Sequence, residues 1–123
     1  MKVNLIVIRT DQPKALSEFY QALGMDFECH QHGNGPLHYS TEINGTVFEI
    51  YPLMKHQEEP DRSLRLGFAL DHLDEKIEQL RSHGVEVVMG PKHSEWGYMA
   101  IIKDLDGRKI ELKEEKGHSI ISQ

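Results

Sequence analysis

Two carboxylates stand at matching places in a phrase that occurs twice in the chain. The stretch INGTVFEIY contains Glu49 and the stretch LDGRKIELK contains Glu111, and each glutamate follows the first residue of an expected turn by five positions. Carboxylates at such places can ligate a divalent metal, act as general bases or hold the polar groups of a ligand. The alternation of strand residues also allows a simpler interpretation, in which both carboxylates face water.

The elements around these glutamates repeat as well. The pairs Asn44-Gly45 and Asp106-Gly107 are typical of hairpin turns, and each leads into a strand. Hydrophobic periodicity and turn residues predict the order strand, helix, strand, strand, strand in each half of the chain. The first half has predicted strands at 3–9, 25–32, 36–43 and 46–53 and a helix at 11–24, and the second half has strands at 64–70, 85–90, 98–104 and 108–114, a helix at 71–84 and a loop or weak strand edge at 91–96.

The sequence therefore predicts an α+β fold in a single domain, 1–123, built from two tandem βαβββ modules. The modules run over about 1–52 and 64–114, the linker covers 53–63, and the tail after Glu114 is expected to be loosely held. One helix covers only one face of a four-stranded sheet. We therefore expect two modules to form an incomplete barrel with a concave cleft, either within one chain or between two chains.

Composition narrows the class of partner. A net charge of −6 and the lack of a Lys/Arg run argue against a nucleic-acid partner, because such binders need a cationic surface. Cys29 is the one cysteine, so it has no partner for an internal disulfide and the chain fits a reducing compartment. No stretch approaches the roughly 20 apolar residues that cross a bilayer. We therefore expect a cytoplasmic protein without a membrane partner.

Two motifs carry a resemblance to a known family. The first predicted helix ends in F-Y-x-x-L-G at 19–24, and the last hairpin reads D-x-D-G-x-x-I-E-L at 104–112. Together with the two tandem modules, these motifs resemble the vicinal-oxygen-chelate superfamily, which groups glyoxalase I, bleomycin-resistance proteins and extradiol dioxygenases. The resemblance covers nearly the whole chain, and it implies paired βαβββ modules whose sheets form a cleft.

The resemblance also implies where a metal would be held. Metal enzymes of the superfamily place one ligand on the first strand and one on the last strand of each module. The last-strand positions fall on Glu49 and Glu111, whereas the first-strand positions fall on Asn4, or alternatively Leu5, and on Arg65. A divalent ion such as Zn²⁺ or Ni²⁺ needs three or four N or O donors, and a protonated guanidinium offers none. The sequence thus leaves open a metal held by Glu49 and Glu111, or no metal at all.

Arg65 suggests a different use of the same place. It can supply the positive charge between the two glutamates, or it can bind a carboxylate or phosphate of a ligand. The resemblance adds Trp96 and Tyr98 as apolar walls for a ligand, with ordinary core or dimer packing as the alternative. His38 or its neighbour Tyr39 is expected to line the cleft.

Two further histidines have ligand-like spacing. His30 and His32 are two positions apart in CHQH, which places both on one face of a strand. The spacing signals no third ligand, so we interpret them as surface residues.

For function, the sequence leaves two classes open, one a binding protein and one an enzyme. The first is a small-molecule-binding protein of the bleomycin-resistance type, which holds a polar or anionic ligand through Arg65, Glu49, Glu111 and Asn4 without a complete metal site. The second is a metal-dependent lyase or isomerase of the glyoxalase type, in which Glu49 and Glu111 serve as ligands or general bases. The resemblance implies a homodimer in both classes.

Overall fold

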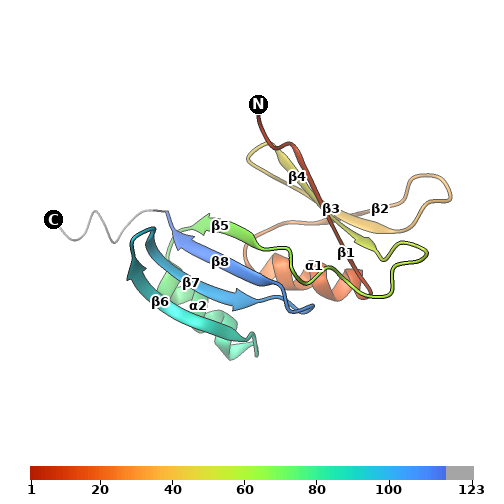
Figure 1. The fold of residues 1–123 in the computed structure, drawn as a ribbon. Coiled ribbons are helices and arrows are strands. Elements are labelled where there is room, and N and C mark those ends of the chain that lie inside the picture. The colour runs from red at the N-terminus through yellow and green to blue at the C-terminus, as the bar shows by residue number, and fades with distance from the viewer. Residues whose placement is uncertain (116–123) are drawn as a thin grey trace. The chain divides into compact units, whose positions relative to one another are not determined.

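The structure, a computed structural model, describes residues 1–115 of the chain (Figure 1). The chain divides into two compact units, Met1–Asp61 and a second that begins at Arg62. Each unit contains one helix and one four-stranded mixed sheet in the order βαβββ. The predicted α+β fold of two tandem modules is therefore confirmed.

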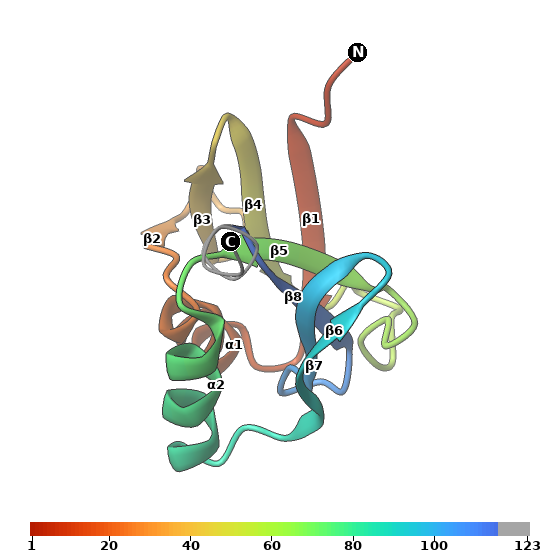
Figure 2. The ribbon, with the colours of Figure 1, turned by 90° about the vertical axis from the view of Figure 1, so that its left-hand side faces the viewer.

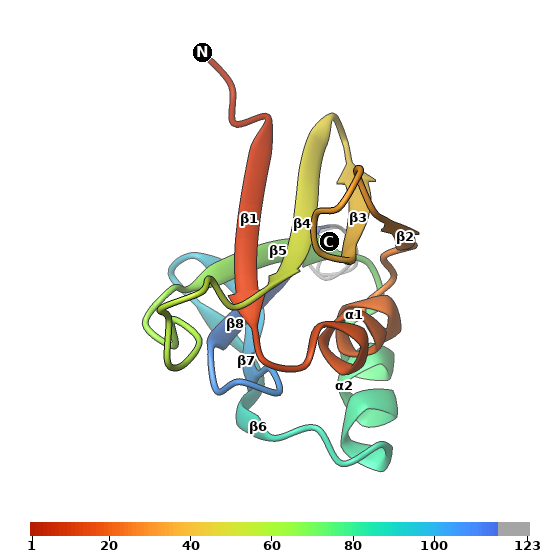
Figure 3. The same cartoon turned by 90° about the vertical axis from the view of Figure 1, so that its right-hand side faces the viewer.

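The first unit is a sheet with strand order β1-β4-β3-β2, so β1 is an edge strand. Its elements are β1 (Leu5–Thr10), α1 (Pro13–Ala22), β2 (Glu28–His30), β3 (His38–Ile43) and β4 (Thr46–Pro52). The β1–β4 pair is parallel and the other pairs are antiparallel. Figure 3 shows β1, β4 and β3 side by side in this order.

The second unit repeats the arrangement with strand order β5-β8-β7-β6. Its elements are β5 (Leu66–Leu70), α2 (Leu73–Ser82), β6 (Val87–Ser94), β7 (Gly97–Lys103) and β8 (Lys109–Glu114). Again the first and last strands of the unit, β5 and β8, pair in parallel. Figure 2 shows α2 alongside this sheet, which it contacts through β6, β7 and β8.

The helices form because their apolar residues recur on one face, which packs against the sheet. In α1, Pro13 stands in the first turn, and Leu16 and Tyr20 are fully buried. The ring of Tyr20 meets that of Phe48 on β4 edge to face, at 5.3 Å between centroids. In α2 the buried residues are Leu73, Ile77 and Leu80, and the acidic first turn and basic last turn suit the helix dipole.

This packing leaves each sheet with a second face, which we call the open face: the side of the sheet opposite its own helix. Side chains alternate along a strand, so the buried residues mark the helix side and their neighbours mark the open face. In β4, Phe48 and Ile50 are buried and Glu49 lies between them; in β8, Ile110 and Leu112 are buried and Glu111 lies between them. Both glutamates therefore belong to open faces, at equivalent places in the two units.

Two strands differ from the sequence prediction. β2 covers three residues, Glu28–His30, rather than 25–32. β6 continues to Ser94, through a stretch that the sequence assigns to a loop or weak strand edge, and two register irregularities between Val87 and Lys92 accommodate Gly90-Pro91 within it. Within residues 1–115 neither helix is long and apolar enough to cross a membrane. The tail expected to be loosely held lies outside the described residues after Glu115.

Candidate functional site

Glu49 lies in the middle of β4, between two neighbouring strands. It stands opposite Val7 of β1 and Ser40 of β3. Its side chain is 19% exposed, so the carboxylate is neither sealed in the core nor fully solvated. A carboxylate in this state can accept hydrogen bonds from a bound molecule at small cost in desolvation.

His38 is a titratable neighbour of Glu49 on the first open face. Of the two residues that the sequence left open, His38 lies on the open face, whereas Tyr39 stands opposite Ile50 and therefore faces the helix side. The imidazole is 2% exposed, and its Nε2 lies 3.9 Å from Oε2 of Glu49. This distance is too long for a direct hydrogen bond. Burial, with the adjacent Cys29, raises the pKa of Tyr39.

Flat side chains continue from His38 across the first open face. The rings of His38 and Tyr51 stack at 4.2 Å with an angle of 6° between their planes. On the other side of Tyr51, the guanidinium of Arg9 lies 5.0 Å from the ring centroid and donates a hydrogen bond to the carbonyl of Pro52. The stack therefore crosses from β3 over β4 to β1 beside Glu49.

The second open face has a different charge. Glu111 stands opposite Gly67 of β5 and Ile101 of β7. The alternation of β8 places Lys109 and Lys113 on the same face, two residues to either side of Glu111. Lys103 of β7 stands opposite Lys109 and pairs with Glu86 at 3.6 Å. Cations therefore outnumber the carboxylate on this face.

The strand register also shows which residues occupy the first-strand positions of the two units. The register places Leu5 opposite Val47, two residues from Val7, which stands opposite Glu49. Leu5 therefore faces the open side of the sheet. Asn4, whose carbonyl accepts a hydrogen bond from the backbone N–H of Val47, belongs to the opposite face. Arg65 is exposed and directly precedes β5. If the alternation of β5 is extended back by one residue, Arg65 lies on the same side of the sheet as Gly67. No described contact joins Arg65 to Glu111.

These residues do not fit the metal that the resemblance implies. A hydrocarbon side chain stands at the first-strand position of the first unit and a protonated guanidinium at that of the second. The four implied positions therefore supply two carboxylates, fewer than the three or four donors that a bound divalent ion takes from a protein. Within residues 1–115 no three His, Cys, Asp or Glu side chains are placed to hold a metal ion.

The two aromatic residues predicted as ligand walls lie in different surroundings. Tyr98 shares the alternation of Ala100 and Ile102, and its hydroxyl donates a 2.6 Å hydrogen bond to Asp74 of α2, so it lies on the helix side of the sheet and not with Glu111. That hydrogen bond, together with burial, raises the pKa of Tyr98 to about 12. Trp96 lies in the turn between β6 and β7 and is 67% exposed.

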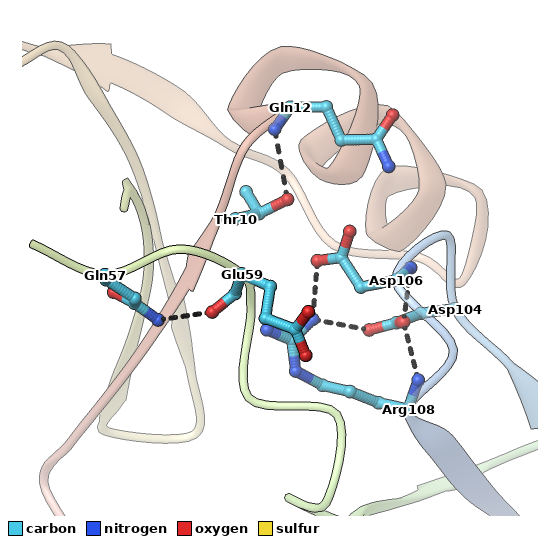
Figure 4. Close-up of polar contacts among 7 residues, drawn as sticks. All are labelled: Thr10, Gln12, Gln57, Glu59, Asp104, Asp106 and Arg108. Carbon is cyan, nitrogen blue, oxygen red and sulfur yellow. Dashed lines mark hydrogen bonds and ion pairs between the residues drawn. The ribbon is translucent and has the colours of Figure 1, made fainter. Parts of the chain in front are cut away.

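A buried charge cluster at the β7–β8 turn is a feature that the sequence did not lead us to expect (Figure 4). Arg108 is 1% exposed and donates from one guanidinium nitrogen to Asp104 at 3.1 Å and to Asp106 at 2.8 Å. The carboxylate of Asp104 also accepts the backbone N–H groups of Asp106 and Arg108. Burial alone would lower the pKa of Arg108, but the hydrogen bonds and charges of the two aspartates raise it above its ordinary value. The spacing D-x-D-x-R was the available signal.

Comparison with protein families matches this chain to one family over most of its length. The model of the "Glyoxalase/Bleomycin resistance protein/Dioxygenase superfamily" matches residues 2–112. Among curated proteins, the chain is 31% identical over 110 residues to "Uncharacterized protein YetH" of Bacillus subtilis (strain 168), an alignment that covers 85% of this chain and 89% of that protein.

Solved structures show the same fold. TnmS3, described as an antibiotic binding protein from Streptomyces sp. CB03234, is 28% identical, has a TM-score of 0.72 and aligns over 94% of this chain and 97% of its own. A possible glyoxalase from Bacillus cereus is 19% identical, has a TM-score of 0.68 and aligns over 92% of this chain and 98% of its own. The second likeness speaks for the fold alone.

Proposed function

Because the chain belongs to the glyoxalase/bleomycin resistance protein/dioxygenase superfamily, we propose that it is a small-molecule-binding protein that holds a polar or anionic ligand on the open face of its second unit. The observation that carries the proposal is the charge of the second open face. Lys109 and Lys113 flank Glu111, and Arg65 precedes the side-chain-free Gly67. A carboxylate or phosphate is the group that such cations bind best.

The two glutamates have a role in this proposal that needs no metal. Glu111 accepts hydrogen bonds from hydroxyl or amine groups of the ligand and so orients it, while the cations of the same face hold its negative charge. Glu49 offers an acceptor of the same kind on the first open face. Leu5 and Arg65 at the first-strand positions support a site that works without the ion of the family's metal enzymes. The likeness to TnmS3, an antibiotic-binding protein, makes an antibiotic-sized molecule the first class to try.

Thermal unfolding in the presence of small molecules tests the proposal. The probes are a panel of carboxylated, phosphorylated and neutral antibiotics, each added to untagged protein. A ligand present at about 100 times its Kd stabilises the folded state by about 2.7 kcal/mol, which is a Tm rise on the order of 10 °C for a chain of this size. We expect the anionic members to give the largest shifts and added salt to reduce them.

Variants then locate the site. Arg65→Ala and Lys109→Ala should each weaken binding of the best probe at least about tenfold, since each removes a charge-assisted hydrogen bond. Lys55 is an exposed cation that precedes Gln57. Lys55→Ala is therefore the matched control and should leave affinity unchanged. Equal affinity in all three variants would overturn the proposed site.

The glyoxalase-type alternative has its own assay. The hemithioacetal of methylglyoxal and glutathione is supplied as substrate, with and without Ni²⁺ or Zn²⁺. We expect no metal-dependent turnover. Metal-dependent turnover that is lost in Glu111→Gln would show that the protein is a lyase or isomerase rather than a binding protein.

We also propose that the protein acts as a homodimer. Val3, Leu5 and Val7 are 62%, 53% and 39% exposed along the edge strand β1 and the residues before it. An apolar row of this kind next to unpaired strand edges is a common contact between copies. Light scattering during size exclusion should give twice 14.2 kDa, and Leu5→Lys should reduce the mass to that of one chain.

A further inference from the structure

The first open face carries an excess of negative charge. The strand register places Glu49 of β4, Ser40 of β3 and Glu28 of β2 in one row across this face. Glu42 follows Ser40 by two residues and therefore lies on the same face. Among the residues of the four strands, Arg9 is the one lysine or arginine that stands against these three carboxylates. This face therefore differs from the open face of the second unit, where cations outnumber the carboxylate.

The charge of Arg9 is directed away from Glu49. Its guanidinium donates to the carbonyl of Pro52 and lies over the ring of Tyr51. The imidazole of His38 stacks on the other side of that ring. Tyr51 is thus covered on both sides and offers no ring face to a further cation.

Among the described residues, Glu49 has no hydrogen-bond donor. Its carboxylate is 19% exposed, and within residues 1–115 its one polar contact is with Nε2 of His38, at 3.9 Å. That distance exceeds the length of a hydrogen bond. A carboxylate that is mostly removed from water without a hydrogen bond costs free energy, which a donor from a bound molecule recovers.

His38 presents a second acceptor at the same place. Its Nδ1 lies 3.3 Å from the carbonyl oxygen of Pro36, and because a carbonyl only accepts, this contact assigns the ring proton to Nδ1. Nε2 then carries a lone pair, 3.9 Å from Oε2 of Glu49. The imidazole is 2% exposed and stacks on Tyr51, so the lone pair is held in position. Two acceptors therefore lie close together with no proton between them, and one group with several N–H bonds can donate to both.

We propose that Glu49 and His38 form a binding site for the ammonium group of a primary amine. An ammonium has three N–H donors and a positive charge, so one N–H bonds the carboxylate while a second bonds Nε2. Glu28 and Glu42 add attraction for a cation at longer range. Two acceptors are too few for a divalent metal ion, which takes three or four donors from a protein. The site lies in the first unit and does not depend on the anionic ligand proposed for the second.

Chemical-shift titration of isotope-labelled, untagged protein with phenethylamine tests the site. Phenethyl alcohol and phenylacetate serve as neutral and anionic probes of similar shape. We expect the amine to give saturable shifts at backbone amides of β3 and β4. The other two probes should bind at least about tenfold more weakly, because they lack the charge-assisted hydrogen bond.

Variants then locate the amine. Glu49→Gln should weaken binding of phenethylamine at least about tenfold, and His38→Phe, which keeps a flat ring and removes the acceptor, about threefold or more. Glu18→Gln is the matched control, because Glu18 is an exposed glutamate of α1 on the other side of the same sheet. Arg65→Ala and Lys109→Ala, which test the second unit, should leave amine binding unchanged.

Three results would overturn the proposal. The first is a titration of the wild-type protein with phenethylamine that gives no saturable shifts. The second is an affinity for the amine that equals that for the alcohol or is unchanged in Glu49→Gln. The third is a lower urea midpoint for Glu49→Gln in the absence of amine, since the carboxylate would then stabilise the fold through bonds within the protein. Circular dichroism of each variant establishes that the fold is retained, and if His38→Phe fails to fold, Glu49→Gln alone decides the test.

Discussion

Arg108 offers the most direct test of what holds the second unit together. Its guanidinium lies between Asp104 and Asp106, whose side chains are 0% and 2% exposed. Replacing Arg108 with Met keeps most of the volume but removes the guanidinium that bonds both buried carboxylates. Breaking a buried pair in this way costs about 3–5 kcal/mol. That loss is a large part of the roughly 5–15 kcal/mol that a domain commonly has.

Urea unfolding at pH 7, followed by far-ultraviolet circular dichroism, measures the effect. With an m-value of about 2 kcal/mol/M, a loss of about 4 kcal/mol lowers the midpoint by about 2 M. Arg108→Lys is the control, because it retains the charge and loses the planar fork, and we expect a smaller loss. Adding Asp106→Asn to Arg108→Met removes one of the two buried negative charges and should recover part of the stability.

An electrostatic role for Arg108 in stability is refuted if the free energy of unfolding of Arg108→Met lies within about 0.5 kcal/mol of that of the wild-type protein at an unchanged m-value. The same holds if Asp106→Asn makes the Arg108→Met variant still less stable, since the cost would then not come from the lost attraction between Arg108 and the carboxylates. The sign of the double-variant coupling therefore separates an electrostatic cluster from simple packing of the arginine stem.

Three smaller predictions follow from single residues. Tyr98→Phe removes the hydrogen bond to Asp74 and should cost about 0.5–1 kcal/mol below pH 10. Since the pKa of Tyr98 is raised from 10 to about 12, this contribution is lost as pH rises through that interval, and absorbance titration should show one late tyrosine that is missing in the variant. Trp96→Ala should change stability by less than about 0.5 kcal/mol, because the indole is 67% exposed, and the fluorescence of this single tryptophan should report ligand or dimer contact by a blue shift. Gly67→Ala should stabilise the fold by about 0.4–1 kcal/mol in urea, because an added Cβ lies 3.8 Å from Glu111 and the backbone has no positive φ; a loss would show that the strand needs glycine there.

The sequence was sufficient for the modules because their signals are local. Asn44-Gly45 and Asp106-Gly107 define hairpin turns, and the alternation after each turn assigns Glu49 and Glu111 to one face of a strand. Apolar residues at helical spacing then decide which face meets the helix. These local patterns are therefore enough to assign both glutamates to the side of the sheet opposite the helix.

The features that the sequence did not reveal depend on register and burial. The stretch 31–37 between β2 and β3 is longer than a tight turn, so its length did not determine that His30 pairs with His38. Register likewise decides that His38 and Leu5 lie on the open face, whereas Tyr39 and Asn4 belong to the opposite face. Arg108 follows a turn and precedes a lysine, a context that suggests solvent, and only the folded turn shows that two aspartates surround it.

The two open faces show how a duplicated module can diverge without changing its backbone. Glu49 and Glu111 occupy the same place, but Glu49 has an imidazole and stacked flat groups beside it, whereas Glu111 stands between two lysines and opposite a glycine. Because Glu111 stands between Lys109 and Lys113, it attracts a further cation less strongly, and it neutralises part of the positive charge of the two lysines. For an anionic probe that has no hydroxyl or amine donor, Glu111→Gln should therefore strengthen binding by removing a repulsive charge, while Glu49→Gln in the other unit should leave that affinity unchanged. An unchanged or lower affinity for this probe in Glu111→Gln would show that the charge of Glu111 does not oppose an anion on the second open face.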